Sequence, residues 1–508
     1  MKKYLFFFSV FLFVLTTLSY ADMEKFPLLK AIKLTLIHNN DILIQKESVK
    51  ASEGDIKISQ SKFDTLVNPY ISYSHSESPI TESYHSQANT VSTGIAVKKS
   101  FRTGINAGIN ASSTRTEDIS SSGETSNLTT IGFSLNIPLL EGLGVEVADA
   151  EELAAKSKLI TTKYNMAHTV SKSIYQTSVL YWNYLLAVKN LKEYTESLHR
   201  TEKILKQVRI LIDKNVRPRA DIEQILASLS SKQSTVFRGE QQVVAGKNNL
   251  ANFIGLDCAE FNKISFPVTD FPKLDKAFLN KLVLRTNEII EESLKKRYDF
   301  LALQQSEKTN KINLIAAINK LKSNLDMNIN VSYKRIEKEK YLGAMIDSFW
   351  KERPGFNFSM MLNYQWPVEN SYAKGLVIRY QSLLKQTIYN KKQLKKTIFA
   401  NIKTEISNLE KSYNSLVESI KSVEYYQKAI NNEREKYRLG MSTIIDVINI
   451  EDKLTSANLN KISAQYNLAL AIVKLQYEAG RIIEIDKEKS DNFNFVYNNI
   501  VSIKNLLK

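Results

Sequence analysis

Two long stretches without glycine or proline are the most restrictive feature of this sequence. Residues 145–217 contain neither residue type, and neither do residues 376–439. Because glycine and proline end most helices, each stretch is free to form one helix of about 100 Å, roughly five times the length of an average helix in a globular protein. Rods of that length do not fit inside a single compact domain.

Apolar residues within the first stretch, and again after Gly440, recur in the rhythm of a coiled coil. They fall on alternating three- and four-residue steps, which places them on one face of a helix, and the only polar members are Thr201 in the first series and Lys461 in the second. The first seam consists of Leu191, Tyr194, Leu198, Leu205, Val208 and Ile212, and the second of Val447, Ile450, Leu454, Ala457, Ala464, Leu468, Ala471 and Leu475. Each helix is therefore expected to pack along a neighbouring helix.

Segments between the rods alternate apolar and polar residues with a period of two, which is typical of strands with unlike faces. The apolar members are Ile131, Phe133, Leu135 and Ile137, then Ile329, Val331 and Tyr333, and then Phe356, Phe358, Met360, Leu362, Tyr364 and Trp366. A turn at Arg102-Thr103-Gly104 predicts a further hairpin. The polar segments 77–90, 112–127 and 335–354 are expected to be solvent-facing loops. Tyr364 and Trp366 suit a membrane interface, although a soluble sheet also buries such residues.

The chain is an internal duplication in the order helix, strands, long helix, turn and helix. Residues 215–222 match residues 440–447 at an offset of 225, whereas Asp41 and Asp299 match at an offset of 258. The 33 additional residues must lie between these points in the first half, where the hairpin around Arg102 is predicted. They either add strands to a sheet or lengthen a hairpin beyond it. The helices expected beside the long rods span about 24–67, 219–254, 277–326 and 442–479.

The first 21 residues have the features of a cleavable signal peptide. Lys2 and Lys3 precede an apolar run of about fifteen residues, and Ala21 ends a small-residue cleavage site. No later stretch approaches the roughly eighteen apolar residues of a spanning helix, so the mature chain is expected to be exported without membrane helices. The expected organisation is a signal peptide at 1–21, a first repeat at 22–254 with strands at about 69–138, a linker or equatorial segment at 255–275, a second repeat at 276–480 with strands at about 327–367, and an equatorial tail at 481–508.

The strand-forming segments raise the question of how their sheet is covered. A sheet with one apolar face and two free edges is unstable by itself, and free edges do not occur in lipid. Several chains that pair edge to edge remove the free edges. Export, strands of about ten residues and polar connections fit an outer-membrane β-barrel assembled from protomers. The expected fold class is therefore mainly α with a membrane β-barrel, built from the duplicated unit.

Composition argues against several other functions. The single cysteine, Cys258, excludes a disulfide framework and a cysteine-built metal site, and the five histidines are scattered without ligand spacing. The sequence contains no nucleophile motif or phosphate-binding loop. The formal charge of +16 is spread along the rods and not gathered in one basic motif, which argues against a nucleic-acid partner. We therefore expect no enzyme, no cofactor and no metal site.

The chain resembles the TolC-like outer-membrane efflux protein family over nearly its whole mature length. The resemblance rests on the paired layout, on Tyr437-Arg438-Leu439-Gly440-Met441-Ser442-Thr443-Ile444-Ile445-Asp446-Val447 with its match at 215–222, and on Asn39-Asn40-Asp41 near the start. It implies a homotrimer with a shared twelve-stranded barrel in outer-membrane lipid, four strands from each chain, that continues into a long α-helical tunnel across the periplasm.

The same resemblance implies a function. The trimer would be a passive channel of a tripartite efflux or type I secretion system, which joins a periplasmic adaptor and an inner-membrane pump to the exterior. The alternative is a soluble periplasmic coiled-coil adaptor or scaffold protein. An adaptor typically has one helical hairpin flanked by compact β-domains, whereas this sequence predicts two hairpins and strands compatible with lipid.

The turns that close the two hairpins carry the candidate gating residues. Asp221 and Asp446 occupy equivalent places in the first helical turn after each of them. A carboxylate there either faces the helix dipole alone or, with Asp446 in three symmetric copies, forms a ring at a narrow entrance. Tyr437 either packs at the tip or hydrogen-bonds Asp221 of the neighbouring hairpin, as the resemblance implies for a closed tunnel.

Two of these positions depart from the family pattern. Ser442 stands where the family often has an arginine, and Asn449 stands at its second common pore aspartate. A lock that holds the closed state is therefore expected to be built differently, with Arg217 or Arg438 as candidates.

The turn residues themselves have a simpler chemistry. Asn215 and Gly440 both tolerate the left-handed conformation that ends a helix. If the docking mode of the family holds, an adaptor would bind at the same tips, where Val216, Leu439 and Met441 are the candidate contacts.

Overall fold

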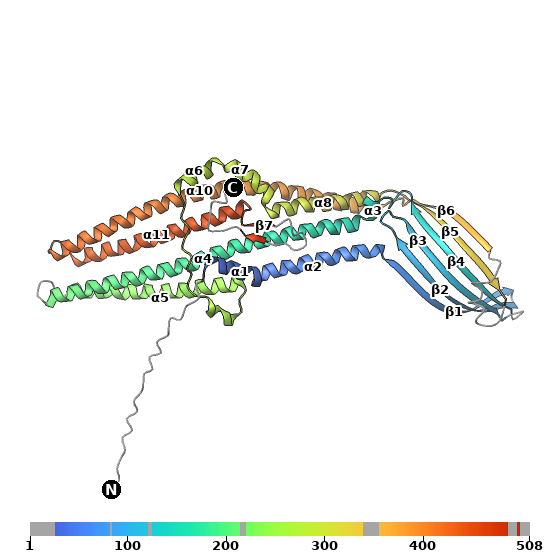
Figure 1. Ribbon diagram of the computed structural model, residues 1–508, viewed down its shortest axis with the longest axis horizontal. Helices are drawn as coiled ribbons and strands as arrows, with labels where there is room; N and C mark the ends of the chain where they lie inside the picture. Colours follow the sequence, from blue (N-terminus) through green and yellow to red (C-terminus); the bar gives the residue numbers. More distant parts are fainter. Residues whose placement is uncertain are drawn as a thin grey trace, which may run out of the picture. The chain divides into compact units, whose positions relative to one another are not determined.

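The computed structural model describes residues 26–81, 84–119, 124–213, 220–338, 355–485 and 495–497, as long helices and an antiparallel sheet (Figure 1). These residues divide into two compact units. The helical unit consists of the described parts of Met1–Leu43, Thr169–Ser293 and Phe399–Lys508, and the sheet unit consists of those of Ile44–His168 and Leu294–Ile398. The signal peptide predicted at 1–21 lies outside the described residues.

Two helical hairpins make up most of the helical unit. The first joins α4 (Ala150–Asp213) to α5 (Ala220–Ile254), and the second joins α10 (Ser371–Arg438) to α11 (Ile444–Glu478). The long rods expected from the sequence are α4 and α10, of 64 and 68 residues, and both also contribute residues to the sheet unit. The shorter elements are α1 (Leu28–His38), η2 (Cys258–Lys263), α6 (Lys276–Leu284), α7 (Thr286–Lys296), β7 (Ile483–Ile485) and β8 (Phe495–Tyr497).

Among the described residues, no helix combines the length and the apolar composition that crossing a membrane requires.

The segment that follows α5 lies against the long helix α4. Tyr181 on α4 is fully buried, and its hydroxyl donates to Phe26 O at 2.9 Å and accepts from Thr269 N at 3.0 Å. The ring of Phe271 lies 5.7 Å from that of Trp182, measured between ring centres. These contacts hold Phe26, which precedes α1, and the segment after α5 against the same part of α4.

Six strands form one antiparallel sheet within the described residues, in the order β1-β2-β3-β4-β5-β6 (Figure 1). They are β1 (Thr65–Thr81), β2 (Tyr84–Ser100), β3 (Asn106–Asp118), β4 (Thr125–Pro138), β5 (Asn324–Glu337) and β6 (Gly355–Gln365). The helical elements beside them are α2 (Asn40–Gln60) and η1 (Ser61–Phe63) before β1, α3 (Val145–Ala148) after β4 and α8 (Tyr298–Asn319) before β5.

The strand register gives the sheet two unlike faces. One row of direct neighbours across the six strands consists of Val67, Val97, Ile109, Phe133, Val331 and Phe358. The adjacent row consists of Asn68, Ala96, Asn110, Gly132, Ser332 and Asn357. Because successive side chains of a strand point to opposite faces, the apolar row lies on one face and the small, mainly polar row on the other.

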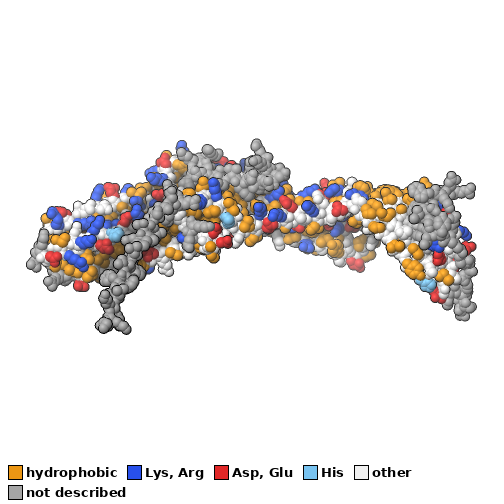
Figure 2. Space-filling view, turned by 60° about the horizontal axis from the view of Figure 1, so that its bottom comes forward, with side chains coloured by type: hydrophobic (Ala, Val, Ile, Leu, Met, Phe, Trp, Pro, Cys, Tyr) orange, Lys and Arg blue, Asp and Glu red, His pale blue; other side chains and the backbone are white. Residues whose placement is uncertain are grey.

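Charged side chains are distributed unevenly between the helices and the sheet. Figure 2 shows basic and acidic side chains interspersed over the helices, whereas hydrophobic and uncharged side chains cover most of the visible part of the sheet. Charged side chains are thus denser over the helices than over the visible part of the sheet.

The expected loops at 77–90 and 112–127 are wrong, because both segments are mostly strand. Glu77 pairs with Gln87, and Glu117 pairs with Thr125. The serines and threonines of these segments continue the backbone ladder, and threonine is well suited to strands. Residues 335–337 of the third expected loop end β5, and 339–354 lie outside the described residues.

Two of the expected helices are also interrupted. The helix predicted at 24–67 is divided at Asn39, whose backbone is extended and whose side-chain Oδ1 accepts from Ile42 N at 3.3 Å. This local bond competes with the helical ladder and starts a new helix. The helix predicted at 277–326 is divided into α6, α7 and α8 at Arg285 and Arg297, the latter with extended backbone.

The two repeats contribute unequally to the sheet. The sequence offsets relate β5 to β1 and β6 to β4, so the hairpin of β2 and β3 accounts for the 33 additional residues. Of the two alternatives that the sequence left open, the structure contains the added strands. It therefore departs from the four strands per chain that the family resemblance implied.

Candidate functional site

The ends of the two hairpins pack into one apolar core. It consists of Ile204, Leu205, Val208 and Ile212 from α4, Ile225 from α5, Ile430 and Tyr437 from α10, and Ile444, Val447 and Leu454 from α11. Several of these residues belong to the two seams identified in the sequence. The coiled-coil rhythm thus marks side chains that join one hairpin to the other.

The turn between α10 and α11 combines a left-handed glycine with a capping box. Gly440 has a φ of +81°, and Met441 N donates to Lys436 O at 2.9 Å to close the end of α10. Thr443 then caps α11, because Asp446 N donates to Thr443 Oγ1 and Thr443 N donates to Asp446 Oδ2, both at 3.2 Å. These reciprocal bonds satisfy backbone donors that the start of a helix leaves unpaired.

Asp446 is exposed, and its carboxylate is engaged within its own turn. The Thr443 hydroxyl donates to Asp446 Oδ2 at 2.6 Å. Hydrogen bonds from the Thr443 side chain, and then from the Thr443 backbone, hold the pKa of Asp446 below its usual range. The group is therefore an anion at neutral pH. Asn449, one turn further along α11, is also exposed.

Asp221, the sequence equivalent of Asp446, has a partner on the other hairpin. The hydroxyl of Tyr437 on α10 donates to Asp221 Oδ2 on α5 at 3.3 Å, and the Tyr437 side chain is buried in the core between the hairpins. This is the contact considered from the sequence. The remaining candidates of the first turn, Asn215, Val216 and Arg217, lie outside the described residues.

The other candidates of the second turn make contacts within their own hairpin. Arg438 Nη2 donates to Glu435 Oε1 at 2.6 Å on the same helix, and the Ser442 hydroxyl donates to Glu433 Oε1. Leu439 and Met441 are 61% and 75% exposed at the tip of the turn. In this structure the link between the hairpins is therefore made elsewhere than at Arg438 and Ser442.

A group of buried and partly buried charges, the Glu451 cluster, joins the hairpins further from the turn. It consists of Glu193 and Arg200 on α4, Arg434 on α10 and Glu451 on α11. Glu451 is fully buried, and it accepts from Arg200 Nε through Oε1 and from Arg434 Nη2 at 3.1 Å through Oε2. Arg200 Nη2 also donates to Glu193 Oε1 at 2.8 Å.

The carboxylates of the Glu451 cluster favour the charged form of Arg200. Burial by itself lowers the pKa of Arg200, but the hydrogen bonds to Glu193 and Glu451 outweigh it, so the pKa lies above its usual range. Two carboxylates face two guanidinium groups, and the cluster is formally neutral. A buried carboxylate with two charged donors is costly to leave without them.

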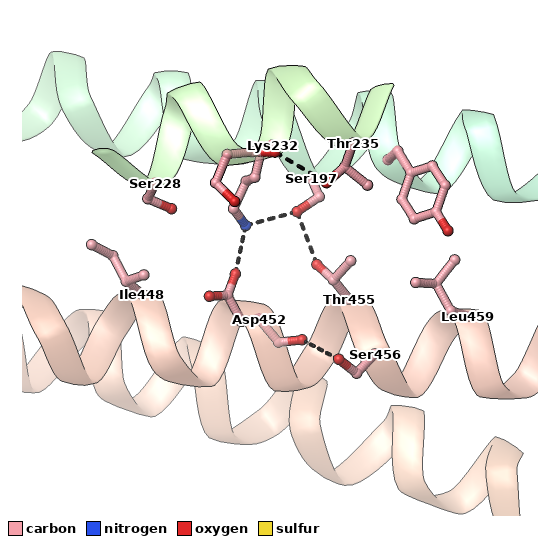
Figure 3. A pocket seen from close by; sticks show the side chains of 11 residues that line it. Ser197, Ser228, Lys232, Thr235, Ile448, Asp452, Thr455, Ser456 and Leu459 are labelled. Atoms are coloured by element: carbon pink, nitrogen blue, oxygen red, sulfur yellow. Dashed lines mark hydrogen bonds and ion pairs between the residues drawn. The ribbon is translucent and has the colours of Figure 1, made fainter. Parts of the chain in front are cut away.

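A polar cavity of about 370 Å³ lies beside the cluster, between α4, α5 and α11 (Figure 3). Lys232 on α5 pairs with Asp452 on α11 at 2.7 Å and donates to the Ser197 hydroxyl on α4 at 2.9 Å. Thr455 on α11 donates to the same Ser197 oxygen at 2.9 Å and accepts from Arg200 at 3.2 Å. One hydrogen-bonded network thus extends from the Glu451 cluster through three helices of both hairpins.

The Glu451 cluster was not predicted from the sequence. A weak signal was available, because Arg200 adjoins Thr201, the polar member of the first seam, and Glu451 adjoins Ile450 in the second. Charges that flank a seam usually set the pairing of helices while they remain in solvent. Which flanking charges meet depends on the alignment of two hairpins that are distant in sequence.

Solved structures of similar fold were found for almost the whole chain. The outer-membrane protein VceC of Vibrio cholerae has a TM-score of 0.64 at 12% identity, over 89% of this chain and 96% of that one. The outer-membrane channel CmeC of Campylobacter jejuni has a TM-score of 0.63 at 13% identity, over 89% and 85%. The open state of the outer-membrane channel MtrE of Neisseria gonorrhoeae has a TM-score of 0.61 at 15% identity, over 89% and 88%.

The chain has the TolC-like fold. No family model matches the sequence, and no curated protein matches it either. At such identities the order and packing of elements are shared, while individual side chains differ freely. In the TolC-like fold of this chain, charged and polar links between the hairpins include the Glu451 cluster, the pair of Lys232 with Asp452, and the bond from Tyr437 to Asp221.

Proposed function

We propose that this chain is one protomer of a homotrimeric outer-membrane channel, a passive conduit of a tripartite efflux or type I secretion system. Substrates would pass from a periplasmic adaptor and an inner-membrane pump through the channel to the exterior. The two-faced sheet carries this proposal. Its apolar row runs through all six described strands, and its other face is small and mainly polar.

The physics of lipid supports an outer-membrane location. A strand that faces lipid on one side and water on the other alternates in this way, and aromatic residues gather at the interfaces. Tyr364 and Trp366 near the end of β6 are 59% and 67% exposed. The solved neighbours are outer-membrane channels, which supports the same location. A soluble coiled-coil adaptor would expose an apolar sheet face of this extent to water, which is unfavourable.

Gating is proposed to occur at the hairpin ends. The Glu451 cluster and the bond from Tyr437 to Asp221 would hold the second hairpin against the first and so keep the entrance narrow. Three symmetric copies of Asp446, anionic at neutral pH, would form a ring that attracts cations and repels anions. The exposed Leu439 and Met441 would meet the adaptor, with Val216 from the first turn.

The experiment is single-channel recording of the purified trimer in planar lipid bilayers. We expect wild-type channels to be small and cation-selective, and Asp446→Asn to reduce the selectivity because the ring loses its charge. Thr443→Ala is the matched control, since it removes the capping hydroxyl from the same turn and keeps the Asp446 carboxylate.

The outcomes separate the parts of the proposal. Protein that remains in water and never inserts would refute the channel. Channels whose selectivity is the same in wild type and Asp446→Asn would leave the channel standing and refute the ring. An equal effect of Thr443→Ala and Asp446→Asn would assign the effect to the turn conformation and not to the charge.

A further inference from the structure

The β2–β3 hairpin is built into the sheet over its full length. β2 has 17 residues and β3 has 13, and the pairing of β3 with β2 runs from Asn106 and Ser100 to Asp118 and Ala88. β2 pairs with β1 and β3 pairs with β4 over similar lengths. The added residues of the first repeat thus form two strands between β1 and β4, and not an extension beyond them.

The turn of this hairpin is anchored to the helical elements of the sheet unit. Gly104 has a φ of +96°, which permits the tight turn, and Gly144 N donates to Thr103 O at 3.2 Å. Arg102 Nε donates to Glu152 Oε2 on α4 at 2.8 Å, and its guanidinium lies 4.9 Å from the centre of the Phe63 ring.

Glu152 is the fixed point of this anchor. It is almost fully buried, and it also accepts from Gln60 at 3.0 Å and pairs with Lys156 at 2.6 Å. Burial raises the pKa of Glu152, but the hydrogen bonds from Lys156, Gln60, Asp149 and Arg102 outweigh it and lower the pKa to about 2. The hairpin turn therefore lies at the end of the sheet where α2 leads in and α4 leads out.

The two added strands present the same faces as their neighbours. Val97 and Ile109 belong to the apolar row, whereas Ala96 and Asn110 belong to the polar row. A hairpin that plugged the interior or covered the outside would break one of these rows. The hairpin instead continues both rows from β1 to β4.

The outer strands, β1 and β6, are suited to pair with further copies of this chain. Every residue of β6 is exposed in the single chain, and on β1 Ile71 and Tyr73 are 79% and 68% exposed. β1 leads away from α2, and β6 returns to α10, so β6 of one copy and β1 of the next run antiparallel. The apolar row reaches both edges, and edges in lipid must be paired.

We propose that three copies close a barrel of about eighteen strands, so that the outer exit is far wider than the twelve-stranded barrel implied by the family resemblance. This inference rests on the proposed channel function. With strands about 4.8 Å apart and tilted by about 40°, the backbone diameter is about 36 Å, compared with about 24 Å for twelve strands. Small side chains such as Ala96, Gly132 and Ser332 leave an opening on the order of 25 Å.

The residues of the inner face indicate which solutes the exit would accept. The inner row is uncharged, and its residues are amides, hydroxyls and groups no larger than a methyl. Other rows of the same face carry charge, because Lys98, Lys334 and Asp326 lie an even number of residues from Ala96 and Ser332. An exit of this width would accept bulky hydrophilic solutes about 20 Å across. Selection would take place at the hairpin ends.

The test counts strands and measures access on the intact trimer. Electron cryomicroscopy of the wild-type trimer in lipid nanodiscs gives the strand number and the barrel diameter directly. For access, Asn110→Cys and Ile109→Cys are made separately in a Cys258→Ser background, because Cys258 is exposed and would react. Membranes are then treated from the outer side with neutral polyethylene-glycol maleimides of graded size.

We expect eighteen strands, and we expect Asn110→Cys to react with reagents up to about 10 Å in radius. Ile109→Cys is the matched control on the opposite face of the same strand, and lipid should protect it from every water-soluble reagent. A twelve-stranded wall, or a cut-off near about 6 Å, would overturn the inference and leave the channel function intact. Protein that never inserts would overturn the channel function itself. If either variant fails to fold, the wild-type strand count still decides.

Discussion

The two hairpins descend from one duplicated unit, yet charge has been placed in them very differently. Glu451 on α11 is fully buried between two arginines, while its equivalent on α5 is Leu226, which is 37% exposed. Arg200 on α4 enters the cluster, while its equivalent on α10 is Tyr425, which is 66% exposed. Equivalent positions of the two hairpins thus share a helical backbone, but in each of these two pairs only one member carries a charge.

The two aspartates after the turns show the same divergence on a smaller scale. Asp221 receives a hydrogen bond from Tyr437 on the other hairpin, whereas Asp446 is held by Thr443 in its own turn. A residue that matches in sequence can thus link two hairpins in one repeat and stabilise one turn in the other. Three substitutions test these differences between the hairpins, and they differ in the size of their expected effect.

Glu451→Leu gives the second hairpin the residue type of the first and should have the largest effect. It leaves Arg434 without its carboxylate partner and leaves Arg200 with Glu193 alone. Because Arg434 is partly exposed, we expect a cost of about 2 kcal/mol for local opening and not the larger penalty of a fully buried charge. Amide hydrogen exchange should show a roughly thirtyfold loss of protection at the ends of α10 and α11, and the channel should open more often.

Two further variants test the cause of that loss. Glu435→Leu makes the same substitution at an exposed carboxylate of α10, which pairs with Arg438, and should leave protection nearly unchanged. The double variant Arg434→Leu and Glu451→Leu removes the guanidinium that Glu451→Leu leaves unpaired and keeps the pair of Arg200 with Glu193, so it should recover most of the protection. If Glu451→Leu is as protected as wild type, the cluster does not hold the hairpins together.

Much of the architecture could be predicted from the sequence because it depends on short-range patterns. The absence of glycine and proline indicated α4 and α10, and the three- and four-residue steps indicated side chains such as Val208 and Leu454 in the core between the hairpins. The two-residue period indicated the strands. The match at residues 440–447 located the second turn together with its left-handed Gly440.

The errors arose where one side chain or one long-range pairing decides the outcome. Asn39 interrupts a helix because its amide bonds to Ile42 N, and an amide in the middle of an amphipathic pattern gives little warning of this. The serine-rich ends of β1 to β4 looked like loops because their strands lack an apolar residue at the alternate positions. The Glu451 cluster was invisible because it requires α4 and α11 to be aligned in space.

Tyr437→Phe should have an intermediate effect, because it removes one hydrogen bond and keeps the ring in the core. A hydrogen bond of this kind contributes about 1 kcal/mol, so we expect roughly a fivefold loss of exchange protection in the first turn of α5 and the last turn of α10. Tyr426→Phe is the control, because Tyr426 packs against the same core. A loss of similar size in both variants would assign the effect to packing and not to the bond with Asp221.

Asp446 should give the smallest effect, together with a dependence on pH that arises from its capping bond. Since its pKa is lowered in the folded chain, the capping bond stabilises α11 fully above the ordinary pKa of an aspartate and is lost as pH falls through the folded value. Exchange protection of the first turn of α11 should therefore decline by about two- to threefold between pH 6 and pH 3, after correction for the intrinsic rate. Asp446→Asn should remove this decline, because an amide does not titrate. A decline of equal size in wild type and Asp446→Asn would mean that another group controls the turn. Asp221 and Asp446 would then differ in their hydrogen-bond partners and not in the effect of their charge.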